Sequence, residues 1–292
     1  MAQLAQPCEQ MISDCFWNSK QSNCSDIFTL VKTTSGYCCS FNYKGIKTDH
    51  PNFREIYANG VGPSFGLSVR LHAEENQYLS SVTKTYGIDV SVHENIKYPD
   101  LSIYSTTIRA GSEVSLPVRP EIIQSEDSVK DTDITTRGCA FSDEIKLSWS
   151  HNYSYATCIN QCKARAIKKL CGCVPYYYYP VFGKSKYCTL LDITCVKTNH
   201  VRYKNSEIEL QTQKGHHAFV KCQCYPQCNE ISYSYQLDQE QLKISENEPK
   251  SNESVLQVYF EKASCTKLQR SVLITWELIL GTKILVNCGR KY

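Results

Sequence analysis

The sequence has little that would place it among enzymes or membrane-spanning proteins. It contains no G-x-S-x-G nucleophile motif, no H-E-x-x-H zinc motif and no phosphate-binding loop. Its most apolar stretch, residues 272–286, is shorter than the ~20 residues that a membrane helix requires and includes Glu277 and Lys283. Residues 1–7 lack the basic segment and apolar run of a signal peptide. These absences predict a non-enzyme that uses no cofactor.

A strong charge of one sign is also missing. The 292 residues include 32 Lys and Arg against 29 Asp and Glu, which gives a formal net charge of +3. Such a balance gives no reason to expect nucleic acid or a strongly acidic partner. The content of 41% hydrophobic residues is enough for the core of one large domain or of two ordinary ones.

Cysteine, in contrast, is abundant. The chain has 17 cysteines, which indicates an oxidising compartment in which bridges reinforce a folded core. Three glycosylation sequons, at Asn23, Asn152 and Asn252, favour the same location. We therefore expect an extracellular piece of a longer protein, because no segment of this sequence would carry it across a membrane.

Ten of the cysteines form one block with nearly symmetric spacing. They are Cys139, Cys158, Cys162, Cys171, Cys173, Cys188, Cys195, Cys222, Cys224 and Cys228. Cys158 and Cys162 are four residues apart on a predicted helix, and Cys222 and Cys224 are two residues apart on an extended segment. The two cysteines of each pair therefore lie on one face of their element. Spacing alone would pair Cys158 with Cys224, Cys162 with Cys222, and Cys139 with Cys228. Ten cysteines nevertheless permit many other connectivities.

Metal binding is the alternative use of these thiols, since His216 and His217 lie nearby in the sequence. The intervals lack the repeated C-x2-C spacing of zinc ribbons and fingers, which favours disulfides. The tyrosines at residues 176–179 could form a ligand platform, but such a run is more often buried against a neighbouring sheet. Asp143 and Glu144 are interpreted as a solvated surface rather than an acid/base pair.

The periodicity of apolar residues predicts an α+β fold. Alternation of apolar and polar side chains predicts strands at residues 64–72, 86–93, 231–237 and 255–260. A helix is predicted over residues 157–170, with Asn152 or Ser154 as its N-cap. The polar stretch at residues 121–137 is predicted to be a loop that leads into the cysteine block.

Three stretches of the sequence carry a family resemblance. Residues 15–42 contain C-F-W at 15–17 and C-C-S-F-N at 38–42, and residues 62–100 begin with G-P-S-F-G-L-S-V-R-L. The third stretch runs from R-G-C at 137–139 to C-Q-C-Y-P-Q-C at 222–228. Together they resemble the degenerin/epithelial sodium channel family, and within it the insect pickpocket-like subunits. The resemblance covers nearly the whole chain.

The resemblance implies a β-rich extracellular hand, with a palm sheet, a β-ball, a disulfide-laddered helical thumb and finger and knuckle elements. Residues 1–292 would form a single extracellular domain of this type. Within it the resemblance implies a finger and knuckle part at about 1–60, palm and β-ball at 61–137, thumb at 138–228, returning palm strands at 229–270 and a truncated or aberrant tail at 271–292.

The resemblance also implies a disulfide map. Its pairs would be Cys139–Cys228, Cys158–Cys224, Cys162–Cys222, Cys171–Cys195 and Cys173–Cys188 in the thumb and Cys15–Cys24 in the finger. Cys38 or Cys39 should bond a cysteine upstream of this chain, although Cys8 could substitute. The pairing of Cys8, Cys38, Cys39, Cys265 and Cys288 is otherwise left open.

In function, the resemblance implies the extracellular gating and sensing region of an amiloride-sensitive, ligand- or force-gated sodium channel subunit. Such subunits form homo- or hetero-trimers in the plasma membrane, with sodium as the permeant ion. This chain lacks both membrane helices of the family and should not conduct alone. Thr136 stands where the family often has an aromatic residue that contacts the first membrane helix, which departs from the family pattern. The alternative is a secreted disulfide-rich binding protein or a dominant-negative one.

Overall fold

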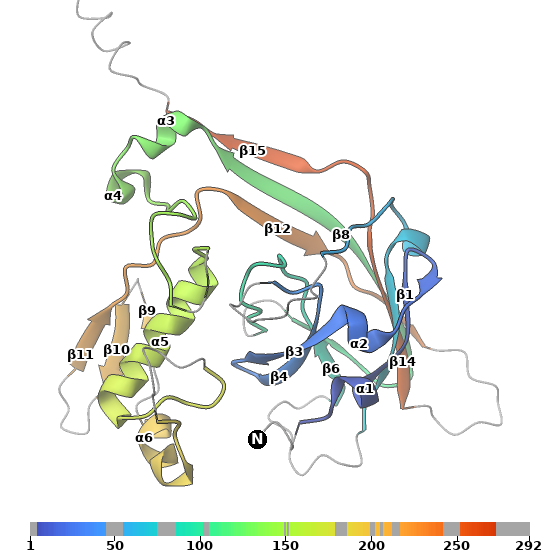
Figure 1. Ribbon diagram of the computed structural model, residues 1–292, viewed down its shortest axis with the longest axis horizontal. Helices are drawn as coiled ribbons and strands as arrows, with labels where there is room; N and C mark the ends of the chain where they lie inside the picture. The colour runs from blue at the N-terminus through green and yellow to red at the C-terminus, as the bar shows by residue number, and fades with distance from the viewer. Residues whose placement is uncertain are drawn as a thin grey trace, which may run out of the picture.

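The fold is given by a computed structural model, which describes residues 5–44, 55–74, 86–101, 105–148, 150, 152–178, 186–198, 202–204, 207–211, 217–241 and 252–272 (Figure 1). For residues 202–204, 207–211 and 217–221 only the backbone is described. Several residues named from the sequence lie outside these ranges: Tyr179, His216, Cys288 and nearly all of the C-terminal stretch at 271–292. The described part is a mixed α+β structure with a large sheet and several disulfides.

An eight-stranded sheet forms the body of the molecule, in the order β12-β8-β14-β5-β1-β2, with β13 and β15 also paired to β8. The strands are β1 (Ile12–Trp17), β2 (Lys20–Gln21), β5 (Leu67–His72), β8 (Ser112–Ser125), β12 (Glu230–Tyr235), β13 (Asp238–Gln241), β14 (Glu253–Phe260) and β15 (Thr266–Arg270). The long strand β8 is parallel to β14 and β15 and antiparallel to β12 and β13. It therefore holds together strands that come from distant parts of the sequence.

One face of this sheet carries the core. In β5 every second residue is buried, namely Leu67, Val69 and Leu71, as the alternation in the sequence predicted. Val114 and Leu116 of β8 are fully buried beside them. The predicted strands at 231–237 and 255–260 correspond to β12 and β14, although Leu237 lies beyond β12 and is exposed.

The segment predicted to be a loop at residues 121–137 is regular instead. Strand β8 continues to Ser125, and two short helices follow, α3 (Asp127–Lys130) and α4 (Ile134–Arg137). The prediction was wrong because it rested on the polar composition of this stretch, which favours a loop when only local sequence is considered. The strand forms nevertheless because β12 and β15 both pair with its second half.

Smaller elements surround the sheet. The hairpin of β3 (Phe28–Thr33) and β4 (Gly36–Phe41) and the pair β6 (Ile88–Val90) and β7 (Thr106–Ile108) lie on its core side, where Ile88 and Val90 pack against the core. The predicted strand at 86–93 is thus shorter than expected. A separate sheet of β9 (Arg202–Lys204), β10 (Glu207–Gln211) and β11 (His217–Lys221) was not predicted. Short helices α1 (Cys8–Met11), α2 (Cys24–Ile27) and η2 (Pro63–Phe65) complete the N-terminal half.

Helix α5 (Tyr155–Cys171) stands beside the sheet rather than on it, with the β3–β4 hairpin between them (Figure 1). The Ser154 side chain accepts a hydrogen bond from Thr157 N, so Ser154 rather than Asn152 is the N-cap. Gly172, at φ 70°, ends the helix in a left-handed conformation that glycine adopts without strain. The turn η4 (Leu190–Asp192) and helix α6 (Ile193–Thr198) follow at its far end. No helix in the described ranges has the length and apolar character to cross a bilayer.

Candidate functional site

The ten-cysteine block forms a ladder of five disulfides, and each pair named from the sequence is joined in the structure. The ladder bridges are Cys139–Cys228, Cys158–Cys224, Cys162–Cys222, Cys171–Cys195 and Cys173–Cys188, and Cys15–Cys24 lies elsewhere. Cys158 and Cys162 are one turn apart on α5 and face the extended segment at 222–228. Because all ten cysteines are oxidised, none offers a thiolate to zinc.

The structure shows which of the two adjacent cysteines, Cys38 or Cys39, pairs with Cys8, a choice that the sequence left open. Cys8 bonds to Cys39, with 5.7 Å between their Cα atoms, and so ties α1 to β4. Cys38 is the neighbour left as a free thiol, and burial raises its pKa, which makes the reactive thiolate scarce. Cys265 is a second free cysteine in the described part of the chain and is exposed.

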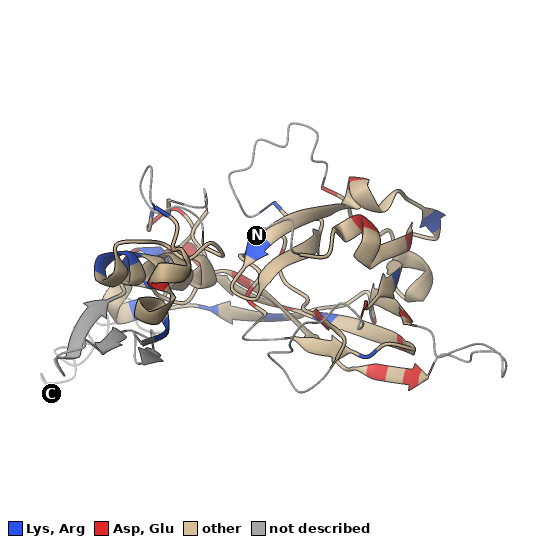
Figure 2. Ribbon diagram, turned by 90° about the horizontal axis from the view of Figure 1, so that it is seen from below, with Lys and Arg blue, Asp and Glu red and all other residues tan. Residues whose placement is uncertain are grey.

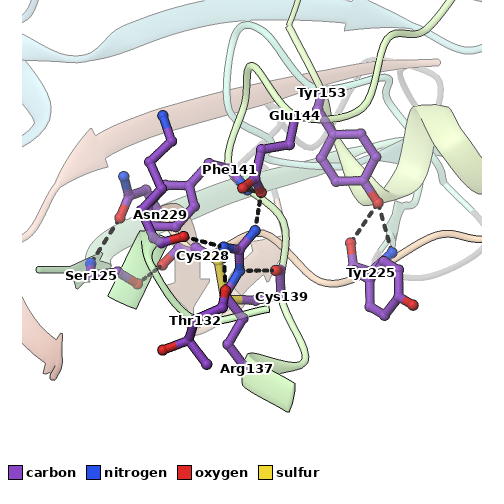
Figure 3. Close-up of a disulfide and its surroundings, with 11 residues drawn as sticks. Ser125, Thr132, Arg137, Cys139, Phe141, Glu144, Tyr153, Tyr225, Cys228 and Asn229 are labelled. Atoms are coloured by element: carbon purple, nitrogen blue, oxygen red, sulfur yellow. Dashed lines mark hydrogen bonds and ion pairs between the residues drawn. A yellow bond between two sulfur atoms is a disulfide. The ribbon is translucent and has the colours of Figure 1, made fainter. Parts of the chain in front are cut away.

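The outermost bridge lies where the ladder meets the sheet, and we call this region the junction: residues 125–144 and 225–229 (Figure 3). Within the described ranges two chain segments cross it, α3–α4 from the end of β8 and Cys228–Asn229 before β12. Cys139 and Cys228 are 1% and 0% exposed. Ala140 N–H donates to Pro226 O and Cys228 N–H to Ala140 O, at 2.8 and 2.9 Å, so the two segments are paired by backbone bonds beside the disulfide.

Arg137 organises the loop that enters the ladder. Its side chain is only 4% exposed and donates to three backbone carbonyls, those of Lys130, Thr132 and Cys139, at 3.0, 3.0 and 2.8 Å. Its remaining nitrogen binds the Glu144 carboxylate (Figure 3). Charged donors to carbonyl and carboxylate oxygens make hydrogen bonds about twice as strong as neutral ones. The guanidinium thus fixes the path of α4 relative to Cys139.

Glu144 and the aromatic ring of Phe141 complete this arrangement. The Glu144 carboxylate also accepts a bond from Phe141 N at 2.8 Å, and the guanidinium carbon of Arg137 lies 5.0 Å from the centre of the Phe141 ring. The interpretation of Asp143 and Glu144 as a solvated surface therefore fits both residues, which are exposed, although the Glu144 side chain is 24% exposed and also binds Arg137. A hint was present in the sequence, because an arginine and a glutamate flank Cys139 within eight residues.

Two more contacts lock the other side of the junction. Ser125, the last residue of β8, donates from its hydroxyl to Cys228 O at 2.8 Å and from its backbone N–H to the Asn229 side chain at 2.8 Å (Figure 3). The Tyr153 hydroxyl, in a side chain that is 1% exposed, donates to Tyr225 O at 2.6 Å and accepts from Tyr225 N at 2.8 Å. Polar atoms at the junction are therefore paired within the protein and hold the ladder and the end of β8 as one unit.

A second contact between ladder and body lies at the far end of α5. Tyr37 of the β3–β4 hairpin stacks on Tyr176 with 6.4 Å between ring centres, and the Lys32 ammonium lies 5.3 Å from the centre of the Tyr187 ring. Tyr178 is 5% exposed and packs on α5, so this tyrosine is buried against a helix rather than the predicted sheet, whereas Tyr176 is partly buried and meets the β3–β4 hairpin. This contact consists of aromatic and cation–π interactions worth about 1 kcal/mol each, which makes it weaker than the junction.

The segment at residues 93–100 connects two parts of the molecule. The Lys97 ammonium binds the Glu230 carboxylate and Ile231 O on β12, at 2.8 and 3.0 Å, and lies 3.4 Å from the Glu94 carboxylate. The Asp100 carboxylate accepts a bond from Asn160 of α5 at 3.3 Å. The segment therefore contacts both the sheet and the ladder helix.

His93 in this segment predicts a pH dependence of stability. Its Nδ1–H donates to Glu94 O at 2.8 Å, Ser40 Oγ lies 3.2 Å from Nε2, and burial and the charge of Lys97 lower its pKa. The folded state thus binds fewer protons at His93 than the unfolded state, so this contribution to stability is lost as the pH falls below about 6.5. Urea unfolding at several pH values should show a smaller loss for His93→Gln than for the natural protein.

The charged and titratable groups around His93 must be separated from His93 itself in this experiment. Burial raises the pKa of Glu94, whose contribution therefore changes in the opposite direction as the pH falls. Lys97 and Glu230 face the same site, and the Tyr43 ring packs edge-on against His93. Because these groups remain in the variant, the difference between the two proteins isolates His93, and identical pH profiles would contradict the prediction.

A serine, a histidine and a glutamate lie next to one another on the outer face of the sheet, as in a catalytic triad, but their geometry is not that of a triad. Ser13 Oγ is 2.6 Å from His72 Nε2, but His72 Nδ1 is 3.7 Å from Glu253, beyond hydrogen-bond distance. Arg70 binds Glu253 and Asp14 instead, at 2.8 Å each, so the glutamate orients the arginine rather than the imidazole. Among the described residues, no group of three His, Cys, Asp or Glu side chains is arranged to bind a metal ion.

The three sequon asparagines are spread over the surface. Asn23 begins α2 beside Cys24, Asn152 precedes the N-cap of α5, and Asn252 precedes β14; all three are exposed. Thr136 lies in α4 and is also exposed, next to Arg137.

Comparison with known proteins shows what the chain is similar to. Residues 1–289 match the model of the amiloride-sensitive sodium channel family. Pickpocket protein 28 of Drosophila melanogaster is 27% identical over 267 residues, which cover 80% of this chain and 43% of the relative. Sodium channel protein Nach of Drosophila ananassae is 26% identical over 275 residues, covering 91% of this chain and 50% of the relative.

A vertebrate relative is more distant. Epithelial sodium channel subunit beta of Bos taurus is 25% identical over 182 residues, which cover 62% of this chain and 27% of the relative. The chain spans about half the length of the insect relatives that it matches.

Proposed function

Because this chain belongs to the amiloride-sensitive sodium channel family, we propose that it is the extracellular gating and sensing region of a sodium channel subunit. The single observation that supports this most directly is the junction. A rigid disulfide ladder meets the end of β8 there, next to β15, through one disulfide and one buried arginine. A stiff element joined to a sheet at one end is suited to transmit movement.

In this proposal the elements take the parts of a hand. Residues 61–137 and 229–270 are the palm with its β-ball, residues 138–228 the thumb, and residues 1–60 the finger and knuckle part. The large sheet, the β3–β4 and β6–β7 pairs and the ladder are compatible with these assignments. The palm would lead through β15 toward a membrane-spanning segment of the whole protein.

The proposed mechanism is a shift between two arrangements of the ladder. A stimulus that breaks the weak contact between the β3–β4 hairpin and Tyr176 or Tyr187 would free the far end of α5. The ladder would then turn about the junction as one body, because five disulfides prevent it from bending. The junction passes this rotation to β8 and β15, and so to the pore of the assembled channel.

The whole protein would act in the plasma membrane as a homo- or hetero-trimer with related subunits, passing sodium ions and blocked by amiloride. The test is to express the full-length protein in oocytes, alone and with partner subunits, and to record sodium current with and without amiloride. We expect an amiloride-blocked current that Lys32→Ala, which removes the cation–π contact, increases or decreases at least twofold.

Silence in every subunit combination would contradict this function. Secretion of the protein without current would instead favour the soluble binding or dominant-negative alternative. Lys20→Ala, at an exposed lysine of β2 far from the ladder, is the control that should leave the current unchanged.

We also propose that Asn23, Asn152 and Asn252 carry N-linked glycans. Their side chains are exposed, and the disulfides favour an oxidising compartment, where such glycans are added. Protein from insect cells should lose mass on treatment with an N-glycosidase, in as many steps as there are occupied sites. Asn→Gln at each position should remove one step, and an unchanged mass for all three would contradict the proposal.

A further inference from the structure

The balanced net charge of the chain conceals a separation of charge in space. Residues 139–198 contain eight Lys and Arg against three Asp and Glu, a surplus of five positive charges where the whole chain has +3. The rest of the chain is therefore slightly negative. Figure 2 shows blue segments gathered on the helices of the ladder and a strand with red segments, β13, at the opposite end of the long axis.

The end of the ladder presents apolar side chains with a basic surround. Leu190, Leu191 and Ile193 are 78%, 93% and 57% exposed. Lys197 lies one turn after Ile193 on the same face of α6, and Lys186, 66% exposed, lies 3.8 Å from Asp192 in the same turn. We call these five residues, Lys186, Leu190, Leu191, Ile193 and Lys197, the ladder tip.

This surface is held in a fixed shape. Disulfides at Cys188 and Cys195 clamp both ends of the turn, and the Thr189 and Asp192 side chains form a reciprocal capping box within it. The leucines therefore stay exposed instead of collapsing onto the protein. Large apolar side chains grouped on a rigid, exposed surface mark interaction sites.

The opposite end of the molecule carries the complementary charge. Glu240 of β13 is directly opposite Glu113 of β8, and Asp238 lies two residues away on the same face. All three are exposed, and no ion pair involves them within the described ranges. Like charges opposite one another destabilise a strand pair, and Leu237 beside them is 45% exposed. We call these four residues, Glu113, Leu237, Asp238 and Glu240, the acidic edge.

We propose that the ladder tip of one subunit binds the acidic edge of the next. Both surfaces combine exposed leucine with charge, and their charges are opposite, so a second copy of this chain fits each of them. The surfaces differ and lie at opposite ends of the molecule, so the contact is heterologous, of the kind that closes a ring. This inference rests on the proposed function as a subunit of a multi-subunit channel and identifies which surfaces meet.

The test uses sedimentation of the purified chain at low and at high salt. We expect self-association that weakens with salt, because exposed charges are screened. The tip variant Lys186→Glu/Lys197→Glu and the edge variant Asp238→Lys/Glu240→Lys should each associate at least about tenfold more weakly. A mixture of the two variants should recover association, because each then offers a surface that matches the other.

A control variant, Lys20→Glu/Lys267→Glu, makes the same change in net charge as the tip variant, at exposed positions outside both surfaces, and should behave like the natural chain. The inference is overturned if the chain remains monomeric at every concentration, if the tip and edge variants associate normally, or if their mixture fails to recover. The proposed function is tested separately, because the sodium current of the full-length protein is an independent measurement and a negative sedimentation result does not contradict it.

Discussion

Replacing Cys139 and Cys228 together by alanine is expected to lower the free energy of unfolding by about 3 to 4 kcal/mol. The two cysteines are 89 residues apart, and a loop of that length closed alone would be worth about 4.6 kcal/mol. The inner bridges remain, however, and they already hold Cys158 to Cys224. The outer bridge therefore closes only the two short segments that lead from Cys139 to Cys158 and from Cys224 to Cys228, which lowers the expected effect.

The ladder provides a matched control for this experiment. The Cys171–Cys195 bridge spans 24 residues, but Cys173–Cys188 lies inside it, so it closes only the two short segments from Cys171 to Cys173 and from Cys188 to Cys195. Chain entropy alone thus predicts a loss of about 2.6 kcal/mol for Cys171→Ala/Cys195→Ala, against about 3.4 kcal/mol for the outer bridge. Any loss in the Cys139 and Cys228 variant beyond this difference measures how strongly the disulfide supports the junction.

Urea unfolding of the three proteins, with hydrogen exchange on each native state, checks the prediction. In the outer variant, exchange should rise at the backbone N–H of Ser125, Ala140 and Cys228, whose bonds flank the bridge. In the control these amides should stay protected. A loss below about 1 kcal/mol for the outer variant would show that the backbone pairing at the junction suffices without the disulfide.

Much of the fold could be predicted from local sequence patterns. Strand β5 and helix α5 were predictable because their apolar residues follow one period and because the helix has a serine cap at one end and a glycine at the other. Cysteine spacing led to the three nested pairs for a similar reason. Positions four apart on a helix and two apart on an extended segment leave few ways to connect the two faces.

The features that were missed depend on partners far away in the sequence. The second half of β8 is polar and contains Pro120, and it becomes a strand because β12 and β15 pair with it from more than a hundred residues away. Glu144 looks like an ordinary surface acid until Arg137 is placed beside it. The separate sheet of β9–β11 is a local exception, because Glu207–Gln211 alternates polar and apolar residues but was not recognised as a strand. Cys8 was recognised as a partner for Cys38 or Cys39, but no sequence pattern could choose between two adjacent cysteines.

Arg137→Ala should be the most damaging single substitution at the junction, with a loss of about 3 kcal/mol. It removes the donor to three backbone carbonyls and leaves the Glu144 carboxylate, 24% exposed, without its partner. Unpaired buried acceptors cost more than the bonds themselves contribute. Arg137→Lys should recover only part of the loss, since one ammonium cannot reach carbonyls that a planar guanidinium contacts on several sides.

Arg119→Ala is the matched control, because it removes an arginine that also binds a glutamate, Glu261, but is 49% exposed. An exposed pair of this kind is worth at most about 1 kcal/mol. The comparison therefore separates burial from charge, and a double-mutant cycle with Glu144→Gln separates the ion pair from the bonds to the carbonyls. We expect the coupling between Arg137 and Glu144 to account for less than half of the loss, because three of the four acceptors are backbone carbonyls. Equal losses for Arg137→Ala and Arg119→Ala would contradict the prediction, because they would mean that the disulfide and the backbone bonds hold the junction alone. The direction in which the ladder turns about the junction would then not depend on Arg137.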